Sequence, residues 1–279
     1  MSIQKFKPII WAKNIEEGLK RDSVFYEDCN HEYEGVAKKP GDSIKILGIG
    51  EPTVRRFSDG KLHELDTPEA IEDVSMTLPI NQIADFNFFV DDLDRRQSEG
   101  KVLDKYTERA KYKIMQEEDQ YIANMALAKN AFVFNKSNST ATTADTILDM
   151  INKAYTALLK KDVPMTKDVI ITLDFDHLEV LRKAYEQLDT NNSAMMKNGR
   201  VGMYHNIIVK ASNNVAEQGG YKYIQLKTRD AISFVRPHIH LEAYKPEKYF
   251  GDAVKGYAIF DGDLTAANEM VVIKSKVNA

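Results

Sequence analysis

The sequence lacks the features that crosslink a protein, insert it into a membrane or direct its secretion. It contains one cysteine, Cys29, so neither an intrachain disulfide nor a cysteine-based zinc site can form. No apolar run approaches the roughly 20 residues that a membrane-spanning helix requires. The N-terminus turns polar too early for a secretory signal. We therefore expect synthesis in a reducing cytoplasm and no membrane partner.

Charge and familiar motifs exclude further classes. With 42 acidic and 38 basic side chains, the net charge of -4 argues against binding nucleic acid by bulk positive charge. The pair Gly48 and Gly50 lacks the third glycine and the following helix of a dinucleotide fingerprint. Acidic neighbours should raise the pKa of the Cys29 thiol, so it is a poor nucleophile. The sequence predicts no catalytic residue, no cofactor and no metal.

The first third of the chain has few residues that could build a core. Residues 1–28 have apolar residues at helical spacing and predict a thin amphipathic helix. Residues 30–85 are extended, with an Asp59-Gly60 turn and prolines at 68 and 79 that argue against a central strand. So long a segment with so little to bury predicts a hairpin arm that reaches outward.

A long helix should follow the arm. Residues 92–129 carry apolar side chains every three or four positions, and Asp91, Asp92 and Asp94 suit the N-terminus of a helix. Gly100 should mark a junction, because glycine destabilises a helix interior by about 1 kcal/mol. At 1.5 Å per residue, such a helix would span roughly 57 Å and act as a spine.

The second half predicts an α/β unit and then long strands. A polar linker at 135–145 should precede a helix that Thr143 or Asp145 caps. Alternating strands and helices follow to about residue 233. We expect single strands in KDVIITLDF and in VGMYHNIIVKASNNV, a helix in DHLEVLRKAYEQL, and long strands from residue 231 onwards.

Two clusters could carry chemistry. His238, His240 and Glu242 alternate along one strand face and could bind a divalent metal, although a solvated strand face is the favoured interpretation. Asp174 and His177, with Asp176, could form an acid–base or metal site. Their place after a strand and at the start of a helix favours capping instead.

The tip of the arm carries the charged pair Arg55 and Arg56. One interpretation is a solvated turn. The other is that the arm reaches a neighbouring molecule, where arginine is suited to ion pairs with acidic groups such as those on the spine helix. The sequence leaves both interpretations open.

The order of these elements resembles the major capsid proteins of tailed bacteriophages, whose Hong Kong 97-type fold encapsulin shells share. The resemblance covers nearly the whole chain, and no single segment carries it. The segments that match are IIWAKNIEEGLKRDSVFYEDCNHEYEG, PGDSIKILGIGEPTVRRF, LPINQIADFNFFVDDLDRRQSEGKVLDKYTERAKYKIMQEEDQYIANM, NGRVGMYHNIIVKASNNV and AISFVRPHIHLEAYKPEKYFGDAVKGYAIFDGDLTAANEMVVIK.

The resemblance implies an α+β capsid fold with named parts. These are an N-terminal arm (1–30), an extended E-loop (31–85), a peripheral or P-domain with the spine helix (86–139), an axial or A-domain (140–235), returning P-domain strands (236–266) and a closing A-domain strand (267–279). Arg55, Arg56, Asp59 and Lys61 at the E-loop tip are the expected intersubunit contacts.

The function that the resemblance implies is assembly. Similar proteins form hexamers and pentamers that close into an icosahedral shell around double-stranded DNA, without sequence-specific binding. The implied partners are further copies of the chain, a separate scaffolding protein, a portal and a cement protein, and the implied place is the virion capsid, after assembly in the host cytoplasm. The alternatives are an encapsulin-like compartment and, more remotely, a metal-dependent enzyme using His238, His240 and Glu242.

Overall fold

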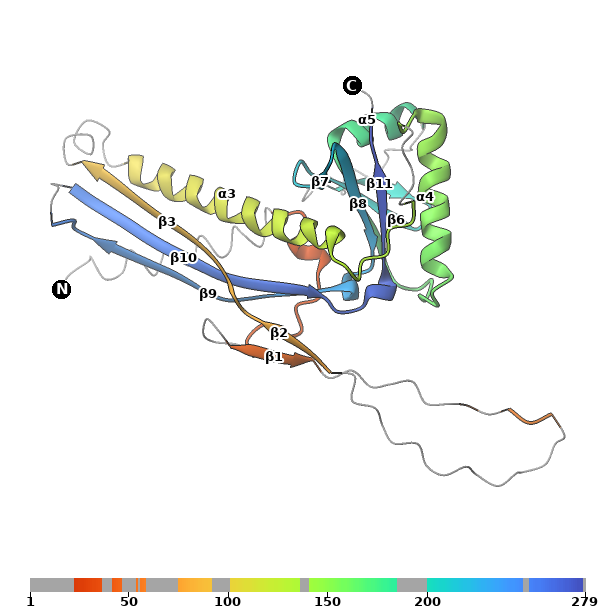
Figure 1. Cartoon of the computed structure of the whole chain (residues 1–279). Helices are drawn as coiled ribbons and strands as arrows, with labels where there is room; N and C mark the ends of the chain where they lie inside the picture. The colour runs from red at the N-terminus through yellow and green to blue at the C-terminus, as the bar shows by residue number, and fades with distance from the viewer. Residues whose placement is uncertain are drawn as a thin grey trace.

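The chain folds into an elongated sheet with one long helix and a more compact α/β body beside it (Figure 1). The structure is a computed structural model. It describes residues 23–36, 42–46, 54, 56–58, 75–91, 101–135, 141–184, 200–247 and 251–277. Within this part of the chain, no helix is long and apolar enough to cross a membrane.

The compact body contains a six-stranded mixed sheet. Its path is β11 (Met270–Ser275), β8 (Tyr221–Lys227), β4 (Val169–Leu173), β6 (Ile207–Ala211) and β5 (Arg200–Tyr204), with β7 (Ala216–Gln218) paired to β8. β4 and β6 run parallel, and every residue of both strands is buried. The β-branched run that predicts a strand in KDVIITLDF therefore forms the middle of this sheet, as expected.

Two helices pack against the compact sheet. α4 (Ala144–Leu159) buries Ile147, Ile151 and Leu158 along one stripe and contacts both β11 and α5 (Phe175–Ala184). Thr143 is the N-cap of α4, and its backbone N–H donates to Thr146 Oγ1 at 2.9 Å. Of the two predicted caps, Thr143 is therefore correct.

The elongated body is a three-stranded antiparallel sheet in the order β3 (Gln82–Asp91), β10 (Gly251–Leu264) and β9 (Ile232–Tyr244). The helix α3 (Lys101–Asn124) lies along one face (Figure 1) and continues into the short 3-10 turn η3 (Met125–Leu127). Side chains shared by the helix and the sheet form a small core. They are Ile114, Met115, Leu241, Val254 and Ala258, with Phe86 and Phe88 packed against them.

A short ribbon covers part of the other face of this sheet. β1 (Ser43–Ile46) and β2 (Met76–Pro79) pair antiparallel. Their buried side chains pack on Ile259 and Val235 of the sheet. The two ends of the predicted arm therefore meet as a paired stem anchored on the elongated sheet.

Three sequence predictions need correction. Within the described residues the spine helix spans Lys101–Asn124 and gives way to the 3-10 turn Met125–Leu127, so it ends before the predicted residue 129. Asp91 is the last residue of β3, not part of a helix start, whereas Asp92, Asp94 and Gly100 lie outside the described residues. The segment VGMYHNIIVKASNNV forms two strands, because His205, at φ 50°, turns the chain between β5 and β6.

Candidate functional site

Only residues 54 and 56–58 of the predicted arm tip are described. Arg56 is exposed, and Arg55, Asp59 and Lys61 lie outside the described residues. Residues 56–58 lie well beyond β1 and β2, far from every labelled helix and strand (Figure 1). The exposed fraction is 86% for Val54 and 46% for Phe57. The tip therefore presents apolar side chains beside a cation.

The base of the arm is fixed by one carboxylate on β10. Asp261 Oδ1 accepts hydrogen bonds from the Tyr121 hydroxyl at 2.6 Å and from the Gly262 N–H at 2.8 Å. Asp261 Oδ2 accepts from the Asn81 N–H at 2.9 Å. Because Asn81 lies between β2 and β3, Asp261 joins the arm stem to the spine helix. The pairing of β9 with β10 shifts register just before Asp261. Such a shift changes the direction in which the Asp261 side chain points.

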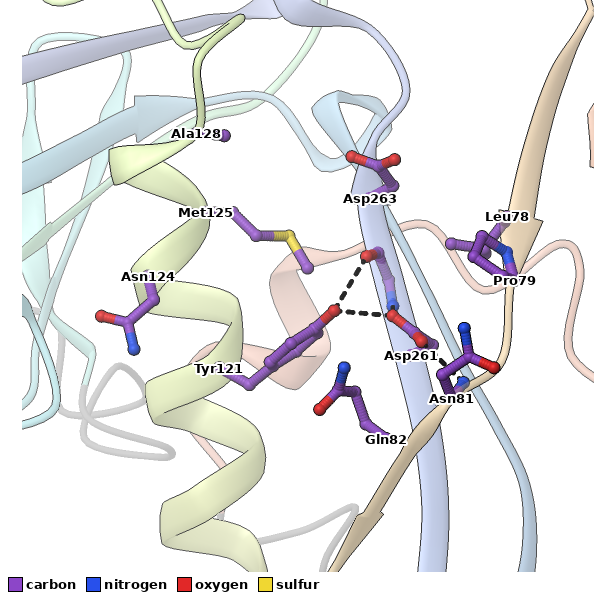
Figure 2. A pocket seen from close by; sticks show the side chains of 11 residues that line it. Leu78, Pro79, Asn81, Gln82, Tyr121, Asn124, Met125, Ala128, Asp261 and Asp263 are labelled. Atoms are coloured by element: carbon purple, nitrogen blue, oxygen red, sulfur yellow. Dashed lines mark hydrogen bonds between the residues drawn. The ribbon is translucent and has the colours of Figure 1, made fainter. Parts of the chain in front are cut away.

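A pocket of about 390 Å³ opens beside this carboxylate (Figure 2). Figure 2 shows Tyr121 and Met125 on one side of Asp261 and Leu78 and Pro79 on the other. Burial raises the pKa of the Tyr121 hydroxyl, and so do its hydrogen bond to Asp261 and the charges of Asp261 and Asp263. The pocket therefore combines apolar walls with negative charge.

A buried ion pair holds the spine helix to β9. Arg236 donates to Glu118 from Nε at 2.8 Å and from Nη2 at 2.5 Å. The Arg236 guanidinium also lies 4.3 Å from the ring centre of Tyr26. Burial raises the pKa of the Glu118 carboxyl, and the charge of Arg236 opposes that shift. The same residue pair thus binds three separate segments together.

Asp119, the next residue along α3, binds the start of the described N-terminal segment. Its carboxylate accepts hydrogen bonds from the Ser23 hydroxyl, and from the N–H groups of Val24 and Phe25 at 3.2 Å each. Burial raises the pKa of the Asp119 carboxyl, and these hydrogen bonds oppose the shift. This side chain therefore fixes the start of the described N-terminal segment from 94 to 96 positions away in the sequence.

Two buried lysines hold the same segment to the compact sheet. Lys210 on β6 forms an ion pair with Asp28 at 2.8 Å, and Lys227 on β8 donates to the Asp28 carbonyl. Burial is the main cause that raises the pKa of the Cys29 thiol to about 11, which confirms the expected direction. Residues 23–30 therefore join α3, the compact sheet and, through Asn30 and Ser233, the start of β9.

The predicted capping role of Asp174 is confirmed. Asp174 Oδ1 accepts from the His177 N–H at 3.2 Å at the start of α5, and also contacts His177 Nδ1. His177 Nε2 lies 2.6 Å from Ser275 Oγ, which in turn lies 2.5 Å from Thr142 Oγ1. Ser275 was not singled out from the sequence. Although the order Ser–His–Asp resembles a hydrolase triad, all three side chains are buried, so the chain of hydrogen bonds fixes α5 against β11.

Two of the three candidate metal ligands on β9, His240 and Glu242, lie against side chains of β10. The rings of His240 and Tyr257 are tilted by 34°, with their centres 5.3 Å apart, and Glu242 pairs with Lys255 at 3.0 Å. The side chain of His238 lies outside the described residues. Within the described part of the chain, no group of three or more His, Cys, Asp or Glu side chains is placed to hold a metal ion.

Solved structures of phage and virus-like particles match the chain over nearly its whole length. A structure from Mycobacterium phage Che8 has a TM-score of 0.73 at 26% identity and covers 91% of each chain. The capsid of Cyanophage P-SCSP1u gives 0.66 at 13% identity, with 92% and 90% covered. A virus-like particle from Pyrococcus furiosus gives 0.58 at 12%, with 94% and 97% covered. No family model and no curated protein matches the sequence.

Proposed function

We propose that the chain is a shell-forming capsid protein with the Hong Kong 97-type fold of tailed-phage major capsid proteins, and that its copies assemble as hexamers and pentamers into an icosahedral shell. One observation carries this: the likeness to the Mycobacterium phage Che8 structure extends over 91% of both chains. A span of that size is too long to be confined to the compact body or to the elongated sheet with its helix. A shell needs such flat, extended subunits, because each copy must contact several neighbours.

We propose the parts of the subunit as follows. They are an N-terminal arm (1–30), an E-loop (31–85), a P-domain with the spine helix (86–139), an A-domain (140–235), returning P-domain strands (236–266) and a closing A-domain strand (267–279). The pairing of β9 and β10 with β3 supports a single P-domain sheet, and the pairing of β11 with β8 supports the closing strand. Because β3 begins at Gln82, before residue 85, the end of the E-loop that is fixed to the rest of the subunit lies nearer Asn81.

The arm tip is the proposed intersubunit contact, through Arg55, Arg56, Asp59 and Lys61. The exposed Val54 and Phe57 beside Arg56 support this proposal. An exposed ion pair contributes only about 0 to 1 kcal/mol, so the tip needs apolar burial as well. Repeated over every subunit of a shell, such modest contacts add up to a durable assembly.

The contents and other partners follow from the same proposal. A net charge of -4 suits a wall that encloses double-stranded DNA without gripping its phosphates. A separate scaffolding protein, a portal and a cement protein would complete the particle, which would assemble in the cytoplasm of the bacterial host. The rival is a compartment that encloses a cargo enzyme. The likeness to the Pyrococcus furiosus particle supports it less well, at lower identity and TM-score.

Electron microscopy of the purified protein, alone and with a co-expressed scaffold, tests the proposal. We expect closed icosahedral particles or rings of subunits. A nuclease-protection assay on particles from infected cells then separates the two kinds of shell. Protected DNA supports the phage proposal, whereas protein cargo without DNA supports the compartment. A monodisperse monomer at high concentration under every condition would overturn both.

A further inference from the structure

The pocket beside Asp261 brings three elements of one subunit together. Leu78 and Pro79 at the end of β2 form one wall, and Tyr121 and Met125, where α3 passes into η3, form the other (Figure 2). Asp261 on β10 lies between these walls. The volume of about 390 Å³ lies in the range of small-molecule sites in proteins.

Two carboxylates give this pocket a negative charge that no cation of the described residues balances. Within this part of the chain, no Lys or Arg forms an ion pair with Asp261 or Asp263, although Asp261 is only 5% exposed. The two charges act at one place, since both raise the pKa of the Tyr121 hydroxyl. A buried carboxylate without a counter-charge is costly, so the pocket would stabilise a cation that enters it.

The polar groups of the pocket can also accept further hydrogen bonds. The Asp261 carboxylate accepts three, whereas its two oxygens offer about four acceptor positions. Asp263 accepts one, from the Leu264 N–H at 2.7 Å. The exposed amide of Gln82, which lines the pocket, adds a carbonyl oxygen. A primary ammonium group matches this set, because it donates three hydrogen bonds and accepts none.

A metal ion suits the pocket less well. Calcium takes about six to eight oxygen ligands, and no group of three or more His, Cys, Asp or Glu side chains among the described residues is placed to hold a metal. The donors that already bind Asp261 would have to move as well. The apolar walls contribute nothing to a bare ion, whereas they can bury a hydrocarbon stem.

We propose that this pocket binds a small aliphatic primary ammonium ion. The ammonium group lies against Asp261 and Asp263, and the hydrocarbon stem lies against Pro79 and Met125. The pocket belongs to a single subunit, so this binding goes beyond the shell function and does not depend on it. Since the walls come from β2, α3 and β10, the bound ligand also holds the arm stem to the end of the spine helix.

Binding to the purified wild-type chain tests the charge and the stem separately. The probe is pentylammonium. Pentanol has the same stem without the charge, and methylammonium has the charge without the stem. By isothermal titration calorimetry we expect pentylammonium to bind with a Kd of about 1 mM, and each control to bind at least tenfold more weakly. At ten times that Kd, pentylammonium should raise the Tm by about 2 to 5 °C.

Asp263→Asn tests whether the binding occurs in this pocket. The variant removes one charge, while its amide oxygen can still accept from the Leu264 N–H, so it should fold and bind pentylammonium about tenfold more weakly. Asp176→Asn, at an exposed position on α5, is the matched control and should bind like the wild type.

Three results would overturn the proposal. They are no binding of pentylammonium at ten times the expected Kd, binding no tighter than that of pentanol, and equal affinities for the wild type and Asp263→Asn. Each would leave the shell function standing, because the electron microscopy of particles tests it without any ligand.

Discussion

Arg236 on β9 and Glu118 on α3 form a bidentate ion pair, with side chains that are 2% and 0% exposed. The pair lies beneath the ring of Tyr26, so it also fixes the N-terminal segment. Removing one member leaves the other charged, buried and without its partner, which costs far more than removing both.

Arg236→Met should therefore destabilise the unassembled protein by about 3 to 5 kcal/mol. Adding Glu118→Leu should recover most of that loss, because two apolar side chains would then replace the charged pair. Urea unfolding followed by circular dichroism measures both variants. A double variant no more stable than Arg236→Met would show that the pair acts through something other than its buried charges.

Asp119→Ala should release residues 23–25 from their hydrogen bonds to α3. The variant removes the acceptor of the Val24 and Phe25 amides, at a cost of about 1 to 3 kcal/mol for the groups left unpaired. Hydrogen exchange of those two amides should accelerate roughly tenfold or more. Glu117→Ala, at an exposed position on the same helix, is the control and should leave their exchange unchanged.

Gly256→Ala tests the close approach of β10 to its neighbours. A Cβ at this position would lie 2.7 Å from the His240 carbonyl oxygen and 2.8 Å from Phe86 Cζ. We expect a loss of about 1 to 3 kcal/mol, because backbone must move. Gly202→Ala, in β5, meets nothing within 4 Å and should not destabilise the protein. Equal unfolding midpoints for the two variants would contradict the packing of this sheet.

Asp174→Asn tests the hydrogen-bond chain through acid unfolding. Burial favours the neutral carboxyl, but the hydrogen bond and charge of His177 outweigh it and hold the pKa of Asp174 below its usual value. The ionised carboxyl therefore stabilises the folded state above about pH 4, and this contribution is lost as the pH falls through its folded pKa. The wild type should exceed the variant by about 1 to 3 kcal/mol at pH 7, and the difference should shrink below pH 4. A difference that grows on acidification would contradict the assignment.

Local patterns were enough to predict much of the fold. The β-branched run in β4, the apolar stripe of α4 and its Thr143 cap, and the long strands β9 and β10 were all expected. The end of β3 at Asp91 and the turn at His205 were not, because an acidic run and a non-glycine turn residue give weak local signals.

The buried polar contacts could not be predicted, since they join residues far apart in the sequence. Asp119 binds Ser23 from 96 positions away, and His177 meets Ser275 across 98. One signal was present: Lys210 and Lys227 stand within apolar strand segments, where a charged side chain requires a buried partner. That partner, Asp28, lies in a segment whose sequence alone suggested only a thin helix.

A cryo-electron microscopy reconstruction of the assembled particle tests the shell most directly. We expect an icosahedral shell in which the elongated sheet with α3 and the compact body fit every subunit position. A particle whose subunit density cannot hold the three-stranded sheet alongside α3, or a protein that forms no particle in any preparation, would contradict the shell.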